Sequence, residues 1–439
     1  MFGYLVTIRT WGVAGSFWLL EDQERDWTWA RQPLRALRLT GSPSHVGGNT
    51  LGPLWYWMLW ASRYLIGPFT GGLPHTGAIA LAIVQSAADI VLLVAVQRKT
   101  RSLWLAVGVV LAVATAPTDL SLTAAMWSPE FSAALAKVTI ALVLMSDARP
   151  ATARALGIAA CAWLTFQAHS SGLFVALPVF AALVFVEFAG PGRLAGAARR
   201  AAGLAGVVLV LQVPFTVDAL RRPSEPVGPG MVVASVRSTL ANPSSIHLAS
   251  TFQAVGSASN VLIGPWSTAW FPWLLVVCTG AAAWRFRREP VLLAATAVPP
   301  MLFVAGFALL QLPFDSYYLL PLAPGLGIVF ALALAGLPAR WLQMAGAALT
   351  VAVVAAQPLR IEASQKDSRF PYYGALARGS REIRRRVEDV QNIETTFALP
   401  PTTDPNFIYW SLGGRILPAS RYTARIAEDG SVSFTPVTP

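Results

Sequence analysis

A dense group of charged side chains follows the first apolar stretch of this 439-residue chain. Residues 21–26 read Glu-Asp-Gln-Glu-Arg-Asp. A carboxylate placed there can act as the general base for an acceptor hydroxyl or as a ligand of a divalent metal. The alternative is a solvated helix start followed by a polar turn. Carboxylates at a membrane exit are costly unless they are wetted or used, so this segment is the first candidate site.

Three further polar segments interrupt the apolar sequence. Residues 41–49 form a Gly/Pro/Ser loop that contains His45, and its paired glycines would let backbone N–H groups approach a phosphate. Asp119 and then Trp-Ser-Pro-Glu at residues 127–130 lie between two later apolar stretches, and His169 lies in a short polar turn. Because Pro129 suits the first turn of a helix, Glu130 is expected near a helix start.

The composition describes a membrane protein. Charged residues make up 13% of the chain, against about 25% in an average soluble domain, and the mean hydropathy is +0.54. In a bilayer, lipid contacts the apolar side chains while helices satisfy their own backbone hydrogen bonds. The formal charge of +11 comes from short basic runs between apolar stretches, so it does not indicate a nucleic-acid partner. We expect an all-α polytopic protein that contacts membrane lipids.

About eleven transmembrane helices are expected on the criterion of ~20 apolar residues per span. They lie near residues 2–20, 76–97, 103–117, 131–146, 153–168, 171–188, 203–219, 265–284, 291–312, 318–337 and 342–357.

Charge then orients these spans. With the N-terminus inside, the predicted cytoplasmic short loops carry twelve Lys and Arg residues, and the short outer loops carry none. This asymmetry is the one that the positive-inside rule requires. The first outer loop, 21–75, and the loop at 220–261 are exceptions, because both contain arginines. These longer loops either cross regardless of charge or bind an anion at the outer surface.

Two segments need a separate interpretation. Residues 51–67 are apolar enough to span, but counting them would place every basic loop outside, so we expect a helix at the outer interface, where Trp and Tyr are typical. Arg9 falls inside the first span. Either that helix starts in the membrane with Arg9 snorkelling, or translation starts upstream; we favour the second.

Asp89 and Lys137 lie in different spans and are expected to form an ion pair as readily as a functional site.

The chain divides at residue 357. Residues 1–357 are expected to form the transmembrane domain, and the polar tail, 358–439, a small extracytoplasmic domain of α/β character. Glu-Asp-Gly-Ser at residues 428–431 predicts a hairpin turn in that tail.

Taken together, these motifs resemble bacterial glycosyltransferases of the GT-C superfamily, in the branch of aminoarabinose transferases and protein O-mannosyltransferases. The resemblance rests on the acidic segment after the first span, the Gly-Pro-Leu-Trp-Tyr-Trp segment at 52–57, the 127–130 helix start and the turn around His169, with a Tyr-rich segment at 315–325. The resemblance spans most of residues 1–340. Gln23 stands where aminoarabinose transferases often have Glu, and Leu51 where they have Lys.

The resemblance implies a catalytic acidic residue at Asp22, followed by the arginine at Arg25. It also implies that a sugar is taken from a polyprenyl-phosphate carrier at the outer face of the membrane. On this basis we expect two catalytic carboxylates, a set of substrate-binding residues and a divalent metal site. The expected catalytic carboxylates are Asp22 and Glu130. The expected substrate-binding residues are Arg25, Asp26, His45, Tyr56 and His169. The expected metal ligands are Asp22 and Asp119.

We therefore expect an inverting glycosyltransferase in the bacterial cytoplasmic (inner) membrane, with a lipid, glycan or protein as acceptor. Two other classes remain open. A secondary transporter or lipid flippase would show repeated halves and discontinuous helices near the midplane. A non-catalytic membrane assembly protein would need no acidic cleft.

Overall fold

The first apolar stretch folds as two short helices rather than one. In the computed structural model α1 (Phe2–Thr10) is followed by Gly12, whose φ of 72° favours glycine, and then by α2 (Val13–Ser16). The predicted helix over 2–20 is therefore broken at Gly12. The structure describes residues 1–43, 49, 52–189, 193–222, 269–310, 315–366, 369–400 and 402–437, together with a few positions between 236 and 261.

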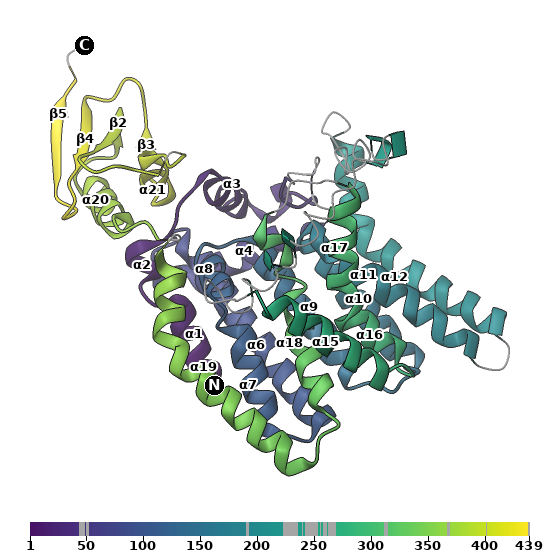
Figure 1. The fold of residues 1–439 in the computed structure, drawn as a ribbon. Coiled ribbons are helices and arrows are strands. Elements are labelled where there is room, and N and C mark those ends of the chain that lie inside the picture. Colours follow the sequence, from purple (N-terminus) through teal and green to yellow (C-terminus); the bar gives the residue numbers. More distant parts are fainter. Residues whose placement is uncertain are drawn as a thin grey trace.

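Each of the other predicted spans contains at least one helix (Figure 1). The helices of this bundle are α6 (His75–Thr100), α7 (Leu103–Ala114), α8 (Pro117–Ala124), α9 (Ser128–Leu144), α10 (Thr152–Ala168), α11 (Leu173–Phe185), α12 (Arg193–Arg221), α15 (Phe271–Arg285), α16 (Pro290–Thr296), α17 (Val298–Leu310), α18 (Ala323–Leu334) and α19 (Ala339–Lys366), with 3₁₀ turns η2 (Ser170–Gly172), η3 (Val186–Ala189) and η5 (Ser316–Leu319).

The expected number of eleven spans is not confirmed. Within the described residues, four helices are long and apolar enough to cross a membrane: α6, the 170–188 helix, α12 and α19. The number rises to six if two bent pairs are each one span, α7 with α8 at 54° and α16 with α17 at 50°. The remaining helices are shorter than a straight crossing requires.

The polar connection after α2 carries α3 (Glu21–Ala30), η1 (Leu34–Ala36), α4 (Leu54–Leu65) and α5 (Gly67–Thr70). Helix α4 has 12 residues, which at 1.5 Å each is about 18 Å and well short of a ~30 Å hydrocarbon core. It buries Trp55, Tyr56 and Leu59 and leaves Trp57 and Tyr64 exposed. This length and two-sided character fit the interfacial helix expected at 51–67.

The tail forms a small α/β unit, which Figure 1 shows at the upper left. It contains α20 (Tyr373–Arg386), β1 (Asp389–Val390), β2 (Asn392–Thr395), α21 (Pro405–Ser411), β3 (Arg415–Ile416), β4 (Tyr422–Ile426) and β5 (Val432–Pro436). Strand β4 pairs in parallel with β2 and antiparallel with β5. The predicted hairpin turn is present between β4 and β5, where Gly430 has a φ of 84°.

This C-terminal unit shares a hydrophobic core with the first polar connection. Buried Tyr373, Leu376 and Ile408 from the tail belong to one cluster with Trp27 and Trp55 from α3 and α4. Helix α19 also runs without interruption through residue 358, where a domain boundary was expected. The two expected parts therefore meet over a continuous helix and a common core.

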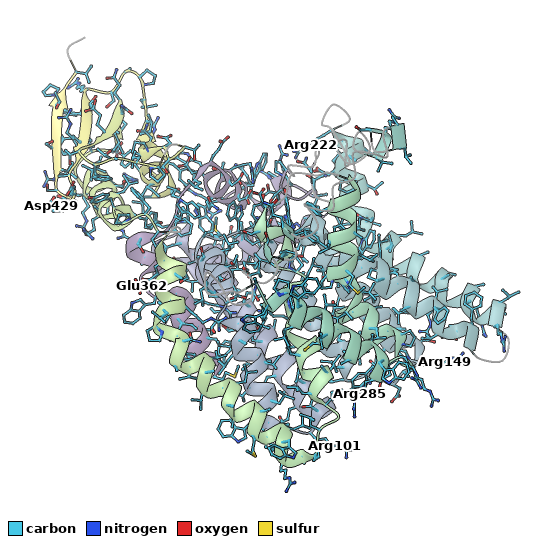
Figure 2. The ribbon with its side chains drawn as sticks, in the orientation of Figure 1. Arg101, Arg149, Arg222, Arg285, Glu362 and Asp429 are labelled. Carbon is cyan, nitrogen blue, oxygen red and sulfur yellow. The ribbon has the colours of Figure 1, made fainter. Side chains whose placement is uncertain are left out.

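The basic residues of the short loops lie away from the C-terminal unit. Figure 2 shows Arg101, Arg149 and Arg285 toward the lower end of the bundle, whereas Arg222 and Asp429 lie toward the upper end. We call the upper end, which carries α3, α4 and the C-terminal unit, the site end. By the positive-inside rule the site end is the predicted outer one.

Four ionised side chains meet in the interior of the bundle. Arg9 contacts the carboxylates of Asp89 and Asp119 at 2.7 Å each, and Lys137 contacts them at 2.8 and 3.3 Å. Arg9 is 1% exposed, so the snorkelling alternative does not hold. The two cations come from α1 and α9 and the two carboxylates from α6 and α8, so the four charges neutralise one another. The predicted pair of Asp89 with Lys137 is part of this network.

Removing one member of this network is expected to destabilise the protein strongly. Lys137→Met leaves buried carboxylates undercompensated, which typically costs ~3–5 kcal/mol. Thermal unfolding of the purified protein in detergent should show a large fall in Tm. Lys99→Met is the matched control, because Lys99 pairs with Glu289 where both side chains are partly exposed, a pair worth about 0–1 kcal/mol. Equal effects of the two variants would contradict the assignment.

Candidate active site

A polar cleft of about 160 Å³ opens at the site end. Five separate segments supply its walls: α3, the 42–43 connection, the start of α9, the turn after α10, and η5. The lining residues are Asp22, Arg25, Asp26, Ser42, Pro43, Trp127, Ser128, Pro129, His169, Tyr317 and Tyr318. The three motifs that were most prominent in the sequence, at 21–26, 127–130 and around 169, are thus brought to one place.

Asp22 lies in the first turn of α3, and its side chain is about one-third exposed. Arg25, one turn later, donates from Nη1 to Asp22 Oδ1 at 2.5 Å. The start of the helix is held by Gln23, whose Oε1 accepts the backbone N–H of Leu20 at 3.2 Å. Gln23 thus caps the helix, a role that either Gln or Glu can perform at this position.

Asp26 is the centre of the cleft's hydrogen-bond network and is 2% exposed. Its Oδ2 accepts from Trp55 Nε1 at 2.7 Å and from Ser42 Oγ at 3.4 Å. Its Oδ1 accepts from Tyr56 Oη at 3.2 Å and from Arg25 Nε and Nη2 at 3.0 and 2.9 Å. One carboxylate therefore ties α3 to α4 and to the loop that follows η1.

Burial sets the protonation of this network. It raises the pKa of Asp26 above its usual value, while Arg25 and Trp55 act in the opposite direction. Burial, and then the neighbouring Asp26 carboxylate, raise the pKa of the Tyr56 hydroxyl. Tyr56 therefore remains a neutral donor at physiological pH.

Aromatic rings from other segments also line the cleft. Trp127 and Tyr317 stack with centroids 5.2 Å apart and an interplanar angle of 25°. The ring of His169 lies 5.6 Å from that of Tyr318, and its Nδ1 is 2.8 Å from Ser171 Oγ. The end of α10 lies close to the segment before α4, so a Cβ on Gly52 would lie 2.5 Å from the Gln167 side chain. Glycine at the start of the Gly-Pro-Leu motif is therefore required for this contact.

Three of the predicted site residues have other surroundings. Glu130 is fully buried in α9, where Gln85 Nε2 donates to its Oε2 at 2.5 Å, and it does not line the cleft. Asp119 lies in the buried network with Arg9 and Lys137 and not beside Asp22. Tyr56 does not line the cleft but donates to Asp26, which does. His45 lies outside the described residues.

Three of the other arginines of the first polar connection have partners of their own. Arg31 stacks over Trp410 at 4.2 Å and donates to its carbonyl, and Arg38 stacks over Trp29 at 4.0 Å. Arg63 donates to the carbonyl of Arg31 at 2.5 Å. Among the five arginines of this connection, Arg25 is the one that lines the cleft.

Sequence reasoning missed several lining residues. Tyr317, Tyr318 and Trp127 were part of segments noted for their resemblance, but no chemistry marked them as site residues. Ser42 was overlooked, since a serine in a Gly/Pro/Ser loop carries no distinguishing signal. A useful signal for the tyrosines was Asp-Ser-Tyr-Tyr at the start of an apolar stretch, where polar and aromatic residues coincide.

The C-terminal unit touches the helix that carries Asp22. The backbone N–H of Asp404 donates to Glu24 Oε1 at 2.9 Å, and Thr403 Oγ1 donates to the carbonyl of Leu19 at 2.5 Å. The Glu21 N–H reaches Thr402 Oγ1 at 3.4 Å. The first turn of α3 is thus held from the tail as well as from the bundle.

The described fold is similar to that of solved structures from the GT-C superfamily, the family that the sequence motifs resemble. Two structures of the aminoarabinose transferase ArnT from Cupriavidus metallidurans are similar to it. The one bound to undecaprenyl phosphate has a TM-score of 0.57 at 14% identity, over 93% of this chain and 84% of that chain. The apo form has a TM-score of 0.55 at 13% identity, over 97% and 92%.

A more distant similarity is to the oligosaccharyltransferase of Archaeoglobus fulgidus in its apo form. Its TM-score is 0.51 at 12% identity, over 88% of this chain and 58% of that chain. No protein-family model matches the sequence, and no curated protein does.

The described residues do not fit the metal site expected at Asp22 and Asp119. They contain no group of three His, Cys, Asp or Glu side chains that could hold a metal ion. Within the cleft, Arg25 already contacts the carboxylates of both Asp22 and Asp26. Asp119 is paired with Arg9 and Lys137 and does not line the cleft with Asp22, so we derive no step through a metal.

The contact between Glu24 and the tail is expected to depend on pH. Burial raises the pKa of Glu24 to about 7. From about pH 4.5 to 7 the folded protein retains a proton that the unfolded chain has lost, so the free energy of unfolding falls as pH rises through this window. We predict that Glu24→Gln, which keeps an acceptor for Asp404, removes this fall.

The measurement is Tm in detergent between pH 5 and 8, with the exposed neighbour Glu21→Gln as control. The wild-type Tm should decline toward pH 8 relative to Glu24→Gln, and the control should follow the wild type. Parallel profiles for wild type and Glu24→Gln would show that the carboxyl titrates no differently in the folded protein.

Proposed function

We propose that the protein is an inverting glycosyltransferase that moves a sugar from a polyprenyl-phosphate carrier to an acceptor at the outer face of the bacterial cytoplasmic membrane. The observation that carries this proposal is the Asp22–Arg25 pair in a polar cleft at one end of an apolar bundle with the GT-C fold. A carboxylate and a guanidinium at the membrane surface provide the two functions that transfer from a lipid phosphate needs: a base and an anion-binding group.

In the proposed reaction, Asp22 accepts the proton of the acceptor hydroxyl. The acceptor oxygen forms a bond to the anomeric carbon as the bond from that carbon to the phosphate oxygen breaks. The electron pair of the broken bond leaves with the polyprenyl phosphate, and one displacement inverts the anomeric configuration. Asp22 suits the role of base because it is the acidic lining residue with a partly exposed side chain.

Arg25 links phosphate binding to base activation. Its Nε and Nη2 are held by Asp26, whereas its Nη1 points to Asp22. A phosphate that enters the cleft competes for this Nη1 donor, since charge-assisted bonds of guanidinium to phosphate are strong. Loss of the Arg25 contact leaves Asp22 Oδ1 free to accept the proton of the acceptor hydroxyl, so we infer that donor binding frees the catalytic carboxylate.

The aromatic wall offers apolar faces to a sugar ring. Trp127 and Tyr317 line the cleft together with residues of α3, and His169 provides a polar ring beside Tyr317. The acceptor is a lipid, glycan or protein hydroxyl.

The transporter alternative is less well supported. It predicts discontinuous helices with an available polar group near the break. The α7–α8 pair is bent, and Asp119 lies just beyond the bend. Asp119, however, is neutralised by Arg9 and Lys137 within the interior. This arrangement stabilises the bundle rather than presenting a carboxylate to a transported ion.

Asp22→Asn is expected to lower kcat by ~10²–10⁴, because the amide cannot accept the proton. The assay is release of undecaprenyl phosphate from undecaprenyl-phosphate sugars in nanodiscs. Glu21→Gln, the exposed neighbour, should turn over normally. Asp26→Asn and Glu130→Gln belong in the same assay. Normal turnover by Asp22→Asn, with either of these inactive, would transfer the role of base to that residue.

Arg25→Ala is expected to weaken binding of undecaprenyl phosphate by about tenfold or more, since a hydrogen bond to a charged group contributes ~1.5–3 kcal/mol and 1.4 kcal/mol is a factor of ten. Binding can be measured by titration of the detergent-solubilised protein. Arg38→Ala is the control, because Arg38 stacks on Trp29 and does not line the cleft. Equal small losses would indicate contacts with headgroups only, and absence of binding by the intact protein would contradict the proposed function.

A further inference from the structure

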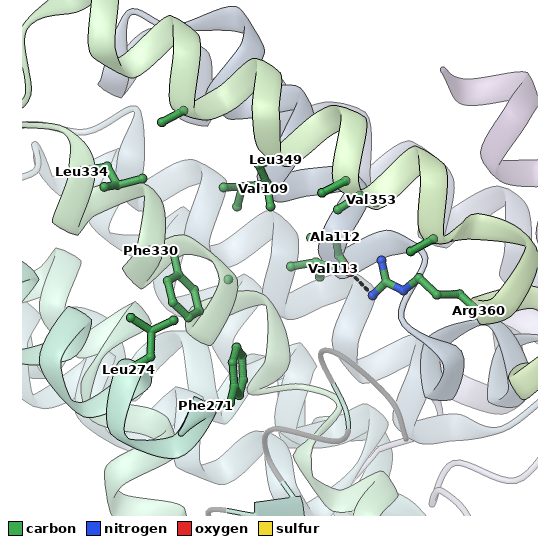
Figure 3. Close-up of a pocket in the computed structure, with 14 residues that line it drawn as sticks. Val109, Ala112, Val113, Phe271, Leu274, Phe330, Leu334, Leu349, Val353 and Arg360 are labelled. Atoms are coloured by element: carbon green, nitrogen blue, oxygen red, sulfur yellow. Dashed lines mark hydrogen bonds between the residues drawn. The ribbon is translucent and has the colours of Figure 1, made fainter. Parts of the chain in front are cut away.

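A second cavity lies within the helical bundle and shares no lining residue with the polar cleft. Its volume is about 420 Å³, within the range of small-molecule sites. Figure 3 shows it between α15 and α18 on one side and α7 and α19 on the other. We call it the α15/α19 groove.

The groove is apolar along its length. Phe271, Leu274 and Phe330 form one wall, and Val353 and Leu349 the other. Small residues widen it, namely Ala112, Gly327, Ala345, Ala352 and Ala356. The outward faces of the two flanking helices are also apolar and exposed, with Trp273 and Val277 on α15 and Val351 and Val354 on α19. This surface, together with the groove, matches a hydrocarbon chain rather than a polar substrate.

One charged side chain lines the groove. Arg360, near the end of α19, is 4% exposed and lies at one end of the cavity in Figure 3. Its Nη2 donates to the carbonyl of Ala112 at 2.9 Å and its Nη1 to Thr115 Oγ1 at 3.0 Å. Gln357 Nε2 donates to the same hydroxyl at 2.7 Å. These bonds hold the guanidinium at the edge of the apolar groove.

A cation inside a membrane helix is costly, and such residues commonly mark binding sites. The structural alternative is that Arg360 only caps α7, since Ala112 and Thr115 lie at the C-terminal end of that helix, where a cation is favourable. Capping alone does not account for an apolar cavity of this size beginning at the guanidinium. A ligand with an anionic group joined to a hydrocarbon chain would match both the guanidinium of Arg360 and the apolar cavity.

We propose that the α15/α19 groove is a binding site for an anionic phospholipid, with one acyl chain in the groove and the phosphodiester on Arg360. A phosphodiester carries one negative charge, which one guanidinium neutralises. Arg360 lies toward the site end of α19, so the lipid belongs to the leaflet on that side. This site is separate from the cleft and does not depend on the proposed transferase activity.

The test is retention of lipid by the purified full-length chain, measured by native mass spectrometry after exchange into detergent with phosphatidylglycerol, phosphatidylcholine or undecaprenyl phosphate. The wild type should retain one phosphatidylglycerol about tenfold better than phosphatidylcholine. Arg360→Gln, which keeps a donor for Ala112, should abolish that preference. Arg340→Gln, at the other end of α19, should keep it.

A second pair of variants tests the groove itself. Ala356→Leu fills the cavity and should reduce phosphatidylglycerol retention, whereas Ala355→Leu, on the neighbouring exposed position, should not.

Equal retention of the two phospholipids by the wild type would overturn the proposal. So would an Arg360→Gln variant with lower Tm but an unchanged lipid preference, which is the capping result. Arg360-dependent retention of undecaprenyl phosphate in place of phosphatidylglycerol would assign the groove to the carrier lipid instead. Arg25→Ala should leave retention unchanged.

Discussion

The carboxylate of Asp26 is buried where the bundle meets the polar connection, and an isolated charge there would be strongly unfavourable. It is tolerated because donors from α3, α4 and the 42–43 segment converge on it. The need to satisfy one carboxylate thereby sets the angle between α3 and α4. Asp22 and Arg25 lie on the same helix, so their positions follow from it. The cleft depends on this constraint more than on any residue expected to react.

Buried charges in the interior of the bundle are likewise stabilised by their partners, which here are side chains of opposite charge. Arg9, Asp89, Asp119 and Lys137 come from four helices and are stable there as a balanced set. Their arrangement fixes α1 and α8 against α6 and α9. Ser128 and Pro129, at the start of α9, line the cleft and come directly before the buried Glu130. Electrostatic pairing in the interior thus positions part of the cleft wall without contributing to its surface.

The C-terminal unit completes the support of α3 from the other side. Its core is continuous with that of α3 and α4. Asp404 donates to Glu24 in α3, and Thr403 donates to the carbonyl of Leu19 just before that helix. A tail that looked like an appendage therefore contributes to the placement of Asp22. Such support explains how a ten-residue helix on a polar connection keeps a defined geometry.

Apolar periodicity and length determined the helical class of the protein and the approximate place of most helices, because a bilayer leaves the backbone few alternatives. The acidic segment at 21–26 and the turn at 169 were also visible, since charges beside apolar runs are rare. Tertiary structure alone decided which carboxylates face the cleft. Asp22 and Glu130 are both acids near predicted helix starts, yet one lines the cleft and the other is buried against Gln85. Arg9, an apparent anomaly in the sequence, is explained by partners 80 and 110 residues away. Pairing between distant residues leaves no local pattern, because the energy of a buried charge depends on what surrounds it in space and not on its neighbours in the chain.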